Sequence, residues 1–403
     1  MTSASSENQM RRRVLGSMIS MLLASGCTER PAPAETGAPI RETTPGGFTL
    51  VSYSSVPDGP VYEFEVVAEI GRRDDVVFGF VADIGLTDTN DILILDGQSS
   101  EIRRFDAAGR EGERVAGPGQ GPGELGRVNG FSIDRLGSVW VVDWGNMRTH
   151  EFPVDGAVRT HPYPVDLFAG LWEGAVAEDG RFWFRESGSD RQPGPSQGGI
   201  AQGTEFVYLT STVPESETVD SIFLGTSPFV TFSLSRGRYS QRLPFTPQRL
   251  VSVDPSGSVW TALSNEYRLV RIDLGGDTLL VIEVEAAAAP LSRRERSAEI
   301  EALEKLIGPD EDFTVDWDVV MPTSKAVVQQ ITIDEQGNAW VQRSNGDGTA
   351  FDVFTRDGDF LARFEGPFTP WRYANPVVRG DRMVTVLSDS LDVHTVLVLG
   401  IPR

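Results

Sequence analysis

The sequence predicts an all-β fold, a six-bladed β-propeller of four-stranded antiparallel blades with one inserted helix. Three observations predict it. A strand of alternating apolar residues, an Asp-x-x-Gly corner and a tryptophan six residues after the aspartate recur along the chain. Further short strands separated by glycine turns follow most copies. Four strands then fill a unit of about 40 to 45 residues, which is typical of propeller blades.

The clearest copies of this repeat lie at residues 131–141, 250–260 and 331–341. In the first copy Asp134 is followed by Gly137 and Trp140, and the other two copies keep the same spacing. Weaker copies lie at residues 175–184, 84–95 and 377–386. The chain therefore contains six units.

The tryptophans of the repeat are expected in the core. A large ring at the same strand position of each blade fills the space between sheets that pack face to face. We expect this role for Trp140, Trp183, Trp260 and Trp340. The alternative is an aromatic cage for a ligand, which requires the four rings to converge on the axis.

The two ends of the chain are expected to close the ring. The last unit starts at residue 377 and ends one strand short, whereas residues 61–70 form a strand without a unit of its own. We expect this strand on the outer edge of the last blade, bonded to residues 393–399. A seventh blade at residues 206–248 is the competing interpretation, and it lacks the corner followed by a tryptophan.

Composition limits the classes of function. The 403 residues are 39% hydrophobic, enough for one large domain. The formal net charge of −22 argues against a nucleic-acid partner, because phosphate binding depends on clustered lysines and arginines. A single cysteine, Cys27, excludes an intramolecular disulfide and a cysteine-based zinc site.

The N-terminal segment is typical of an export signal. Three arginines at residues 11–13 precede an apolar stretch at residues 14–26, which is too short to span a bilayer. The small residues before Cys27 resemble the lipobox of bacterial lipoproteins, which implies cleavage at this cysteine and diacylation of its thiol. An ordinary secretory signal is the alternative. The arginines also resemble a twin-arginine signal, so the export route stays open.

These features predict three parts: a signal peptide at residues 1–26, a lipid-anchored flexible tether at 27–47 and the propeller at 48–403. The tether is rich in Pro, Ala, Thr and Glu and has little to bury. We expect an extracytoplasmic monomer that is held by its lipid at the outer membrane or cell surface of a bacterium.

Several motifs resemble one group of propellers. Residues 143–148 (Asp-x-Gly-Asn-x-Arg) resemble the NHL repeat, and residues 119–125 resemble its glycine-rich loop between blades. Together with the lipobox, Leu243-Pro244-Phe245 and an interblade helix, they are similar to the bacterial six-bladed propeller lipoproteins of the NHL-like or TolB-like kind. The resemblance implies an extracytoplasmic propeller, and for most members of this group no activity is established.

The long segments of the chain are expected on one face. With strands a to d counted outward from the axis, the b–c loops and the d–a connections share a face. The long segments on that side lie at residues 117–129, 187–204, 225–248 and 286–329. Long insertions are usually functional, so we interpret this face as a ligand face; neutral decoration is the alternative.

The last insertion contains the expected helix, at about residues 292–307. Ser292 and Glu295 form a capping box, and Gly308-Pro309 ends the helix. Ile300, Leu303 and Ile307 form an apolar stripe, which we expect to dock on the propeller.

The sequence favours a binding or interaction module over an enzyme. His150, His161 and His394 are far apart, and no hydrolase or phosphate-binding motif is present. The expected partner is a cell-envelope protein, peptide or glycan on the ligand face. The candidate residues for that contact are Asn129, Trp172, Glu173, Arg249, Trp317, Gln330 and Asn375.

Two other functions stay open. The first is a metal-dependent hydrolase or lactonase of the gluconolactonase kind, which would hold Ca²⁺ or Zn²⁺ at the axial entrance through Asn129, Glu173 and Asn375. The second is a purely structural interaction domain. Apart from that metal ion, no cofactor is expected.

Overall fold

The computed structural model describes residues 38–402 with gaps at 73–75, 164–174, 178–179, 190–199, 213–217, 235–236, 242, 309–314 and 346–347. The chain divides into two units, Met1–Thr36 and Gly37–Arg403, and every described residue belongs to the second. Among the helices in these ranges, none combines the length and apolar character that a membrane span requires.

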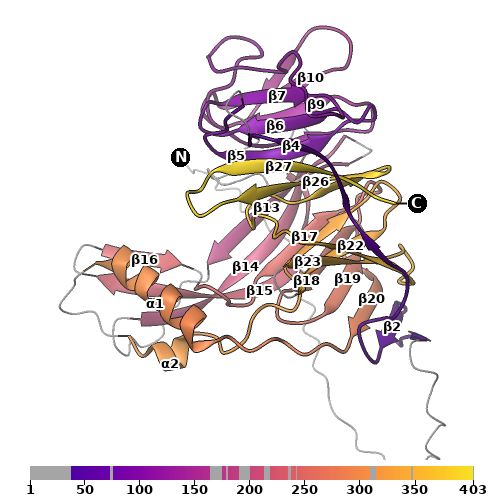
Figure 1. Cartoon of the computed structure of the whole chain (residues 1–403), viewed down its shortest axis with the longest axis vertical. Helices are drawn as coiled ribbons and strands as arrows, with labels where there is room; N and C mark the ends of the chain where they lie inside the picture. The colour runs from indigo at the N-terminus through magenta and orange to yellow at the C-terminus, as the bar shows by residue number, and fades with distance from the viewer. Residues whose placement is uncertain are drawn as a thin grey trace, which may run out of the picture. The chain divides into compact units, whose positions relative to one another are not determined.

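Blades one to three form the first half of a ring of sheets (Figure 1). The described part of blade one has strands β5 (Val81–Leu86), β6 (Ile92–Asp96) and β7 (Glu101–Phe105). Blade two has β8 (Val128–Ile133), β9 (Val139–Asp143), β10 (Arg148–Phe152) and β11 (Arg159–Pro162). Blade three has β12 (Ala175–Val176), β13 (Phe182–Ser189), β14 (Ile200–Thr212), β15 (Thr218–Leu234) and β16 (Gly237–Gln241).

Blades four to six complete the ring. Blade four has β17 (Arg249–Val253), β18 (Val259–Leu263), β19 (Arg268–Ile272) and β20 (Thr278–Val284), followed outward by β2 (Thr49–Tyr53) and β1 (Ile40–Thr43). Blade five has β21 (Gln330–Ile333), β22 (Ala339–Asn345), β23 (Gly348–Phe354), β24 (Phe360–Gly366) and β3 (Val61–Glu63). Blade six has β25 (Val377–Arg379), β26 (Arg382–Ser388), β27 (His394–Gly400) and β4 (Glu65–Ile70).

These six sheets confirm the predicted propeller. The innermost strands contact one another around the ring, β25 with β5, β5 with β8, β8 with β12, β17 with β21 and β21 with β25. Between blades three and four the contact runs from β15 to β17. Within the described ranges only blades two and six have the four strands expected of every blade. Blade one has three strands and blade three has five, and N-terminal strands enlarge blades four and five and complete blade six.

The ring is closed by the N-terminal segment, as predicted, but by only half of the predicted strand. β4 pairs antiparallel with β27 in blade six, whereas β3 pairs in parallel with β24 in blade five. Phe64 separates them, and its ring packs on Phe351, Phe364 and Phe368. The chain therefore crosses between two blades at Phe64, so the assignment of all of 61–70 to the last blade was wrong.

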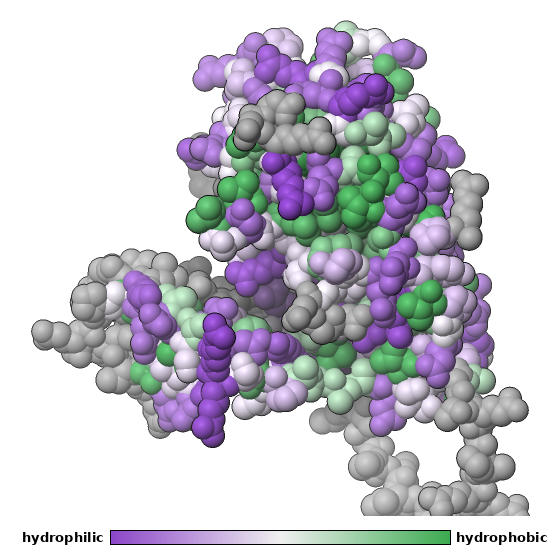
Figure 2. Space-filling model, viewed as in Figure 1, coloured by the Kyte–Doolittle hydropathy of each residue, from purple (hydrophilic) through white to green (hydrophobic). Residues whose placement is uncertain are grey.

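β4 has apolar side chains at the surface. Val66 and Val67 are 51% and 39% exposed on this outer strand of blade six. Figure 2 shows apolar side chains gathered over the part of the ring where β4 and β27 lie in Figure 1.

Sheet structure begins before residue 48, the expected start of the propeller, because β1 pairs with β2.

Residues 206–248 extend blade three and form no seventh blade. β14 and β15 pair along their whole described length, with a bulge between Val207 and Tyr208 opposite Gly225, whose φ is +116°. Figure 1 shows β14, β15 and β16 running away from the other sheets. Much of the material expected as irregular insertion at 187–204 and 225–248 is therefore continuous sheet.

The predicted role of the four tryptophans is confirmed, since each is at most 9% exposed. The corner explains the spacing of the repeat in two of its three clear copies. In the remaining copy, Trp260 Nε1 and Asp254 Oδ2 have no hydrogen-bond partner among the described residues. Asp134 Oδ1 accepts the amides of Leu136 and Ser138, and its Oδ2 accepts from Trp140 Nε1 at 2.8 Å. Asp334 and Trp340 repeat this bond at 3.0 Å. The aspartate thus satisfies both the turn and the buried indole.

The inserted helix α1 (Arg293–Ile307) begins at the predicted capping box, and both of its hydrogen bonds are formed. A second helix of one turn, α2 (Trp317–Val320), follows. The apolar stripe of α1 is buried, as predicted, but it packs on a connecting segment and on α2, and not on the sheets of the propeller. Its partners are Leu243, Phe245 and Met321, which form with it a small separate core.

Candidate functional site

Three candidate residues lie at the same end of the inner strands. Arg249 begins β17, Gln330 begins β21 and Asn375 lies two residues before β25. The structure brings two of them together across blades five and six, because Gln330 Nε2 donates to Asn375 Oδ1. The carbonyl of Arg249 accepts from Arg185 Nη2 at 2.9 Å, which joins blade four to blade three.

Burial and the nearby Arg185 lower the pKa of Arg249. Its guanidinium packs on Gly225, where an added Cβ would lie 2.7 Å from Nη2. Its buried Nε has no hydrogen-bond partner among the residues that the structure describes. Arg249 is therefore a cation held between the extension of blade three and the inner strand of blade four.

The other candidate residues lie elsewhere or outside the described residues. Trp317 belongs to the core formed by the two helices, and its Nε1 donates to Glu304. Asn129 lies on β8, but its side chain is not among those described, and Cys27, Trp172 and Glu173 fall outside the described ranges.

The described residues give the axial metal hypothesis no additional ligand. Asn375 already engages Gln330, and in the described part of the chain no three His, Cys, Asp or Glu side chains gather as a metal site. His150 and His161 lie one register position apart on the paired strands β10 and β11 of blade two, whereas His394 lies on blade six.

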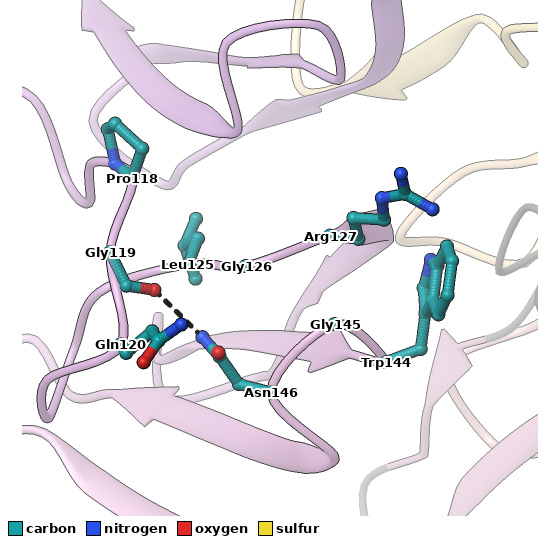
Figure 3. Close-up of a pocket in the computed structure, with 9 residues that line it drawn as sticks. All are labelled: Pro118, Gly119, Gln120, Leu125, Gly126, Arg127, Trp144, Gly145 and Asn146. Atoms are coloured by element: carbon teal, nitrogen blue, oxygen red, sulfur yellow. Dashed lines mark hydrogen bonds between the residues drawn. The ribbon is translucent and has the colours of Figure 1, made fainter.

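A pocket of about 490 Å³ lies on the ligand face of blade two (Figure 3). Residues 118–120 and 125–127 of the connection that leads into β8 form one side. Residues 144–146, which follow β9, form the other. Figure 3 shows Arg127 and Trp144 together at one end of the pocket and the loop of Gly119 and Gln120 at the other.

Asp143 lies beneath this pocket and connects the backbone of its two sides by hydrogen bonds. Its carboxylate is fully buried and accepts the amides of Gly126 at 2.8 Å, Arg127 at 3.1 Å and Asn146 at 3.0 Å. Burial alone would raise the pKa of Asp143, but the contact with His150 and the amide hydrogen bonds outweigh burial and lower that pKa. An ionised carboxylate therefore fixes the backbone on both sides of the pocket.

The NHL-like residues complete the same unit. Asn146 Nδ2 donates to the carbonyl of Gly119 at 2.9 Å, the bond drawn in Figure 3. Arg148 Nη2 donates to the carbonyls of Gln120 at 2.7 Å and Gly121 at 3.0 Å. The Asp-x-Gly-Asn-x-Arg pattern and the glycine-rich loop are thus two halves of one hydrogen-bonded structure.

In blade one a buried aspartate also binds the backbone amides of the neighbouring loops, and this arrangement was not predicted from the sequence. Asp96 ends β6 and accepts the amides of Gly79 at 2.9 Å and Gln98 at 3.0 Å. It is 5% exposed. The signal in the sequence is an aspartate at the end of the second strand, followed by glycine within two residues.

Exposed aromatic rings lie on the connections that lead into blades one and six. Phe80 and Tyr373 are 37% and 51% exposed, and both pack edge-on against Trp371, at centroid distances of 5.3 and 5.2 Å. Aromatic and arginine side chains are enriched where proteins bind partners. These rings were not among the predicted site residues.

Asp83 lies on the inner strand of blade one and has an unusual protonation equilibrium. Its Oδ2 accepts the amide of Phe131, on the inner strand of blade two, at 2.9 Å. Burial raises the pKa of Asp83 to about 7, although the hydrogen bonds from Phe131 and Ile84 act to lower it. The carboxyl can therefore exchange a proton near neutral pH at the inner surface of the ring.

Asp83 should make stability pH-dependent. Its pKa of about 7 in the folded protein exceeds the ordinary 3.8, so its contribution is fully present below about pH 4 and is lost as pH rises through 7. Asp83→Asn should flatten this part of the stability profile, because asparagine does not ionise. It should also lower stability at pH 4, since both carboxyl oxygens accept backbone amides, from Ile84 and Phe131, and the NH₂ group of asparagine would face one of these donors. Urea unfolding between pH 4 and 8 measures both. An unchanged slope would contradict the assignment.

The six blades and the ring of inner strands define the class of the molecule, a six-bladed β-propeller protein. No protein-family model and no curated protein matches the chain. Among solved structures, it is similar to a protein from Bacteroides fragilis described as exported, at 13% identity and a TM-score of 0.44, covering 88% of this chain and 100% of that one.

Two further solved structures are similar. One is a member of the DUF4221 family from Bacteroides vulgatus, at 9% identity and a TM-score of 0.46, covering 85% of this chain and 99% of that one. The other is a streptogramin B lyase, at 12% identity and a TM-score of 0.42, covering 84% and 97%.

Proposed function

We propose that the protein is an extracytoplasmic, lipid-anchored propeller lipoprotein of the NHL-like kind that binds a cell-envelope protein, peptide or glycan. The binding face is the side with the b–c loops and d–a connections, including residues 76–80, 117–127, 144–146 and 371–375. A signal peptide at 1–26 and a tether from residue 27 to the start of β1 at residue 40 would place this face outside the cytoplasm.

The rigid pocket of blade two is the observation that carries the proposal. Its backbone is fixed by the buried Asp143, while the side chains of Arg127 and Trp144 stay at the surface. A loop that is already held in one conformation loses little entropy when a ligand binds. The exposed Phe80 and Tyr373 extend the same face towards blades six and one.

Paired surface variants test the binding face. A chain with Arg127→Gln and Tyr373→Ala should retain less of a saturable component from a cell-envelope extract than the wild-type chain. The control carries Leu136→Ser and Val154→Ser, which replace side chains 77% and 69% exposed in turns on the opposite face. Immobilised chains and quantitative mass spectrometry of bound material make the comparison. Equal loss in both variants, or none in either, would refute the assignment.

Processing at Cys27 tests the anchor. Cys27→Ser should move the protein from the membrane fraction to the soluble extracytoplasmic fraction, because the acyl chains that hold it are no longer attached. Fractionation and intact-mass analysis report the outcome. An unmodified Cys27 in the native protein, or cleavage at another residue, would remove the lipid anchor from the proposal.

A further inference from the structure

Arg127 is one of two exposed arginines that lie over an aromatic ring and pair with no carboxylate among the described residues. The other, Arg372, lies over Tyr373, and only Arg127 lines the pocket. The guanidinium carbon of Arg127 lies 5.0 Å from the centre of the Trp144 ring. Arg103 lies over Phe78 in a similar way, yet it is bound to Glu111 at 2.7 Å. In a chain of net charge −22, an exposed arginine without an acidic partner is available to an external anion.

The position of Arg127 is set before any ligand arrives. Its amide donates to Asp143 Oδ1, so its backbone is part of the fixed loop. Stacking on Trp144 restricts the planar guanidinium, which leaves less side-chain entropy to lose on binding. The five N–H donors of the fork match the two oxygens of a carboxylate.

Apart from Arg127, the groups that the pocket presents to a ligand are polar and uncharged. The side-chain amide of Gln120 has no hydrogen bond among the described residues, so it offers a donor and an acceptor. Two carboxylates are nearby and both are engaged. Glu124 is turned to the amides of Gln120 at 2.9 Å and Gly121 at 2.8 Å, and Asp143 is buried beneath the loop. Trp144 adds apolar surface, whereas Leu125 is buried beneath the pocket at 1% exposure.

We propose that this pocket binds a sugar that carries one carboxylate, a uronate residue. The inference rests on the proposed function in taking a glycan as the ligand. Arg127 pairs with the carboxylate, Gln120 with ring hydroxyls, and apolar surface of the pocket contacts the C–H groups of the sugar. The pocket, of about 490 Å³, has room for one sugar residue, and because it is open to solvent the bound sugar would stay partly exposed. Repulsion by the acidic chain disfavours densely charged polyanions.

Two matched glycosides test the ligand class by calorimetry on the full chain. Methyl β-glucuronide should bind about tenfold or more tightly than methyl β-glucoside, because only the first has a carboxylate for Arg127. Arg127→Gln should remove this preference, and Arg127→Lys should keep only part of it, since lysine lacks the planar fork. The control is Arg135→Gln, an exposed arginine in the opposite-face turn of the same blade, which should change nothing.

Folding is checked by the unfolding midpoint, which should be the same in all variants because Arg127 is exposed. Equal affinity for both glycosides, no glucuronide binding, or a preference that survives Arg127→Gln would overturn the inference. A peptide that binds at Arg127 more tightly than the glucuronide would overturn the sugar class while leaving the binding face intact. Failure of the envelope-extract comparison would instead remove the binding face itself.

Discussion

Asp143→Asn should lower the free energy of unfolding by about 3–5 kcal/mol, the range seen when one partner of a buried charged network is removed. The carboxylate has no exposed surface and accepts backbone amides from both sides of the blade-two pocket. Asparagine has the same shape but only one acceptor oxygen, so its NH₂ group would face amide donors. Buried donors without acceptors are the main source of the loss.

Urea unfolding at pH 7 measures this effect, and Asp155→Asn in an exposed turn of the same blade is the control. The control should change stability by less than about 0.5 kcal/mol, as is usual for surface substitutions. Asp143→Asn should also weaken binding at the pocket under conditions where the variant is folded, because the loop that carries Arg127 loses its anchor. A loss below about 1 kcal/mol would show that the amides find other acceptors.

Asp352→Asn should have an effect of similar size, about 3–5 kcal/mol, at the junction of blades four and five. Asp352 is fully buried on β23 and binds Arg343 at 2.6 Å and Arg363 at 2.7 Å, from the two neighbouring strands. Tyr267 of blade four donates to the same carboxylate at 2.8 Å. Its loss would leave two guanidinium groups and a phenol without a charged acceptor.

An exposed pair gives the matched control for Asp352. Arg268 and Glu283 lie 2.8 Å apart with side chains 43% and 46% exposed, so Glu283→Gln should cost at most about 1 kcal/mol. Thermal and urea unfolding of both variants make the comparison. Similar small losses would mean that the Asp352 cluster contributes no more than a surface ion pair.

The repeat predicted the ring because its residues have a direct structural role. Asp134 and Asp334 bind both their turn and the indole that follows, so the spacing of the pattern is the spacing of a hydrogen bond. The extension of blade three was not predictable in the same way. Its strands follow no repeat, and only Gly225 marks the bulge where the sheet leaves the blade.

The candidate site was predicted less well than the fold. Polar residues at the starts of inner strands were easy to single out, and Gln330 does meet Asn375. Asp83 and Asp96 were not predicted, and Asp143 was noted only as part of the NHL-like motif. Their carboxylates accept amides from segments that lie 16 to 48 residues away in the chain. A sequence pattern of a few residues cannot predict a hydrogen bond to a segment so far away in the chain.

The N-terminal segment has a mechanical consequence. Between residues 40 and 70 it adds strands to the outer edges of blades four, five and six in turn, through β1 and β2, then β3, then β4. A pulling force applied from the N-terminal side would therefore reach β1 first. It would separate the outer strands from blades four, five and six, one blade after another. Arg41 on β1, which bonds the carbonyl of Asp357 and the carboxylate of Asp359, is the first cross-blade contact to resist. Tyr53, which bonds the carbonyl of Gly358 and the amide of Phe360, is the next. The force would reach the inner strands only after β4 had separated from β27. The N-terminal segment would therefore unfold first and delay unfolding of the inner strands.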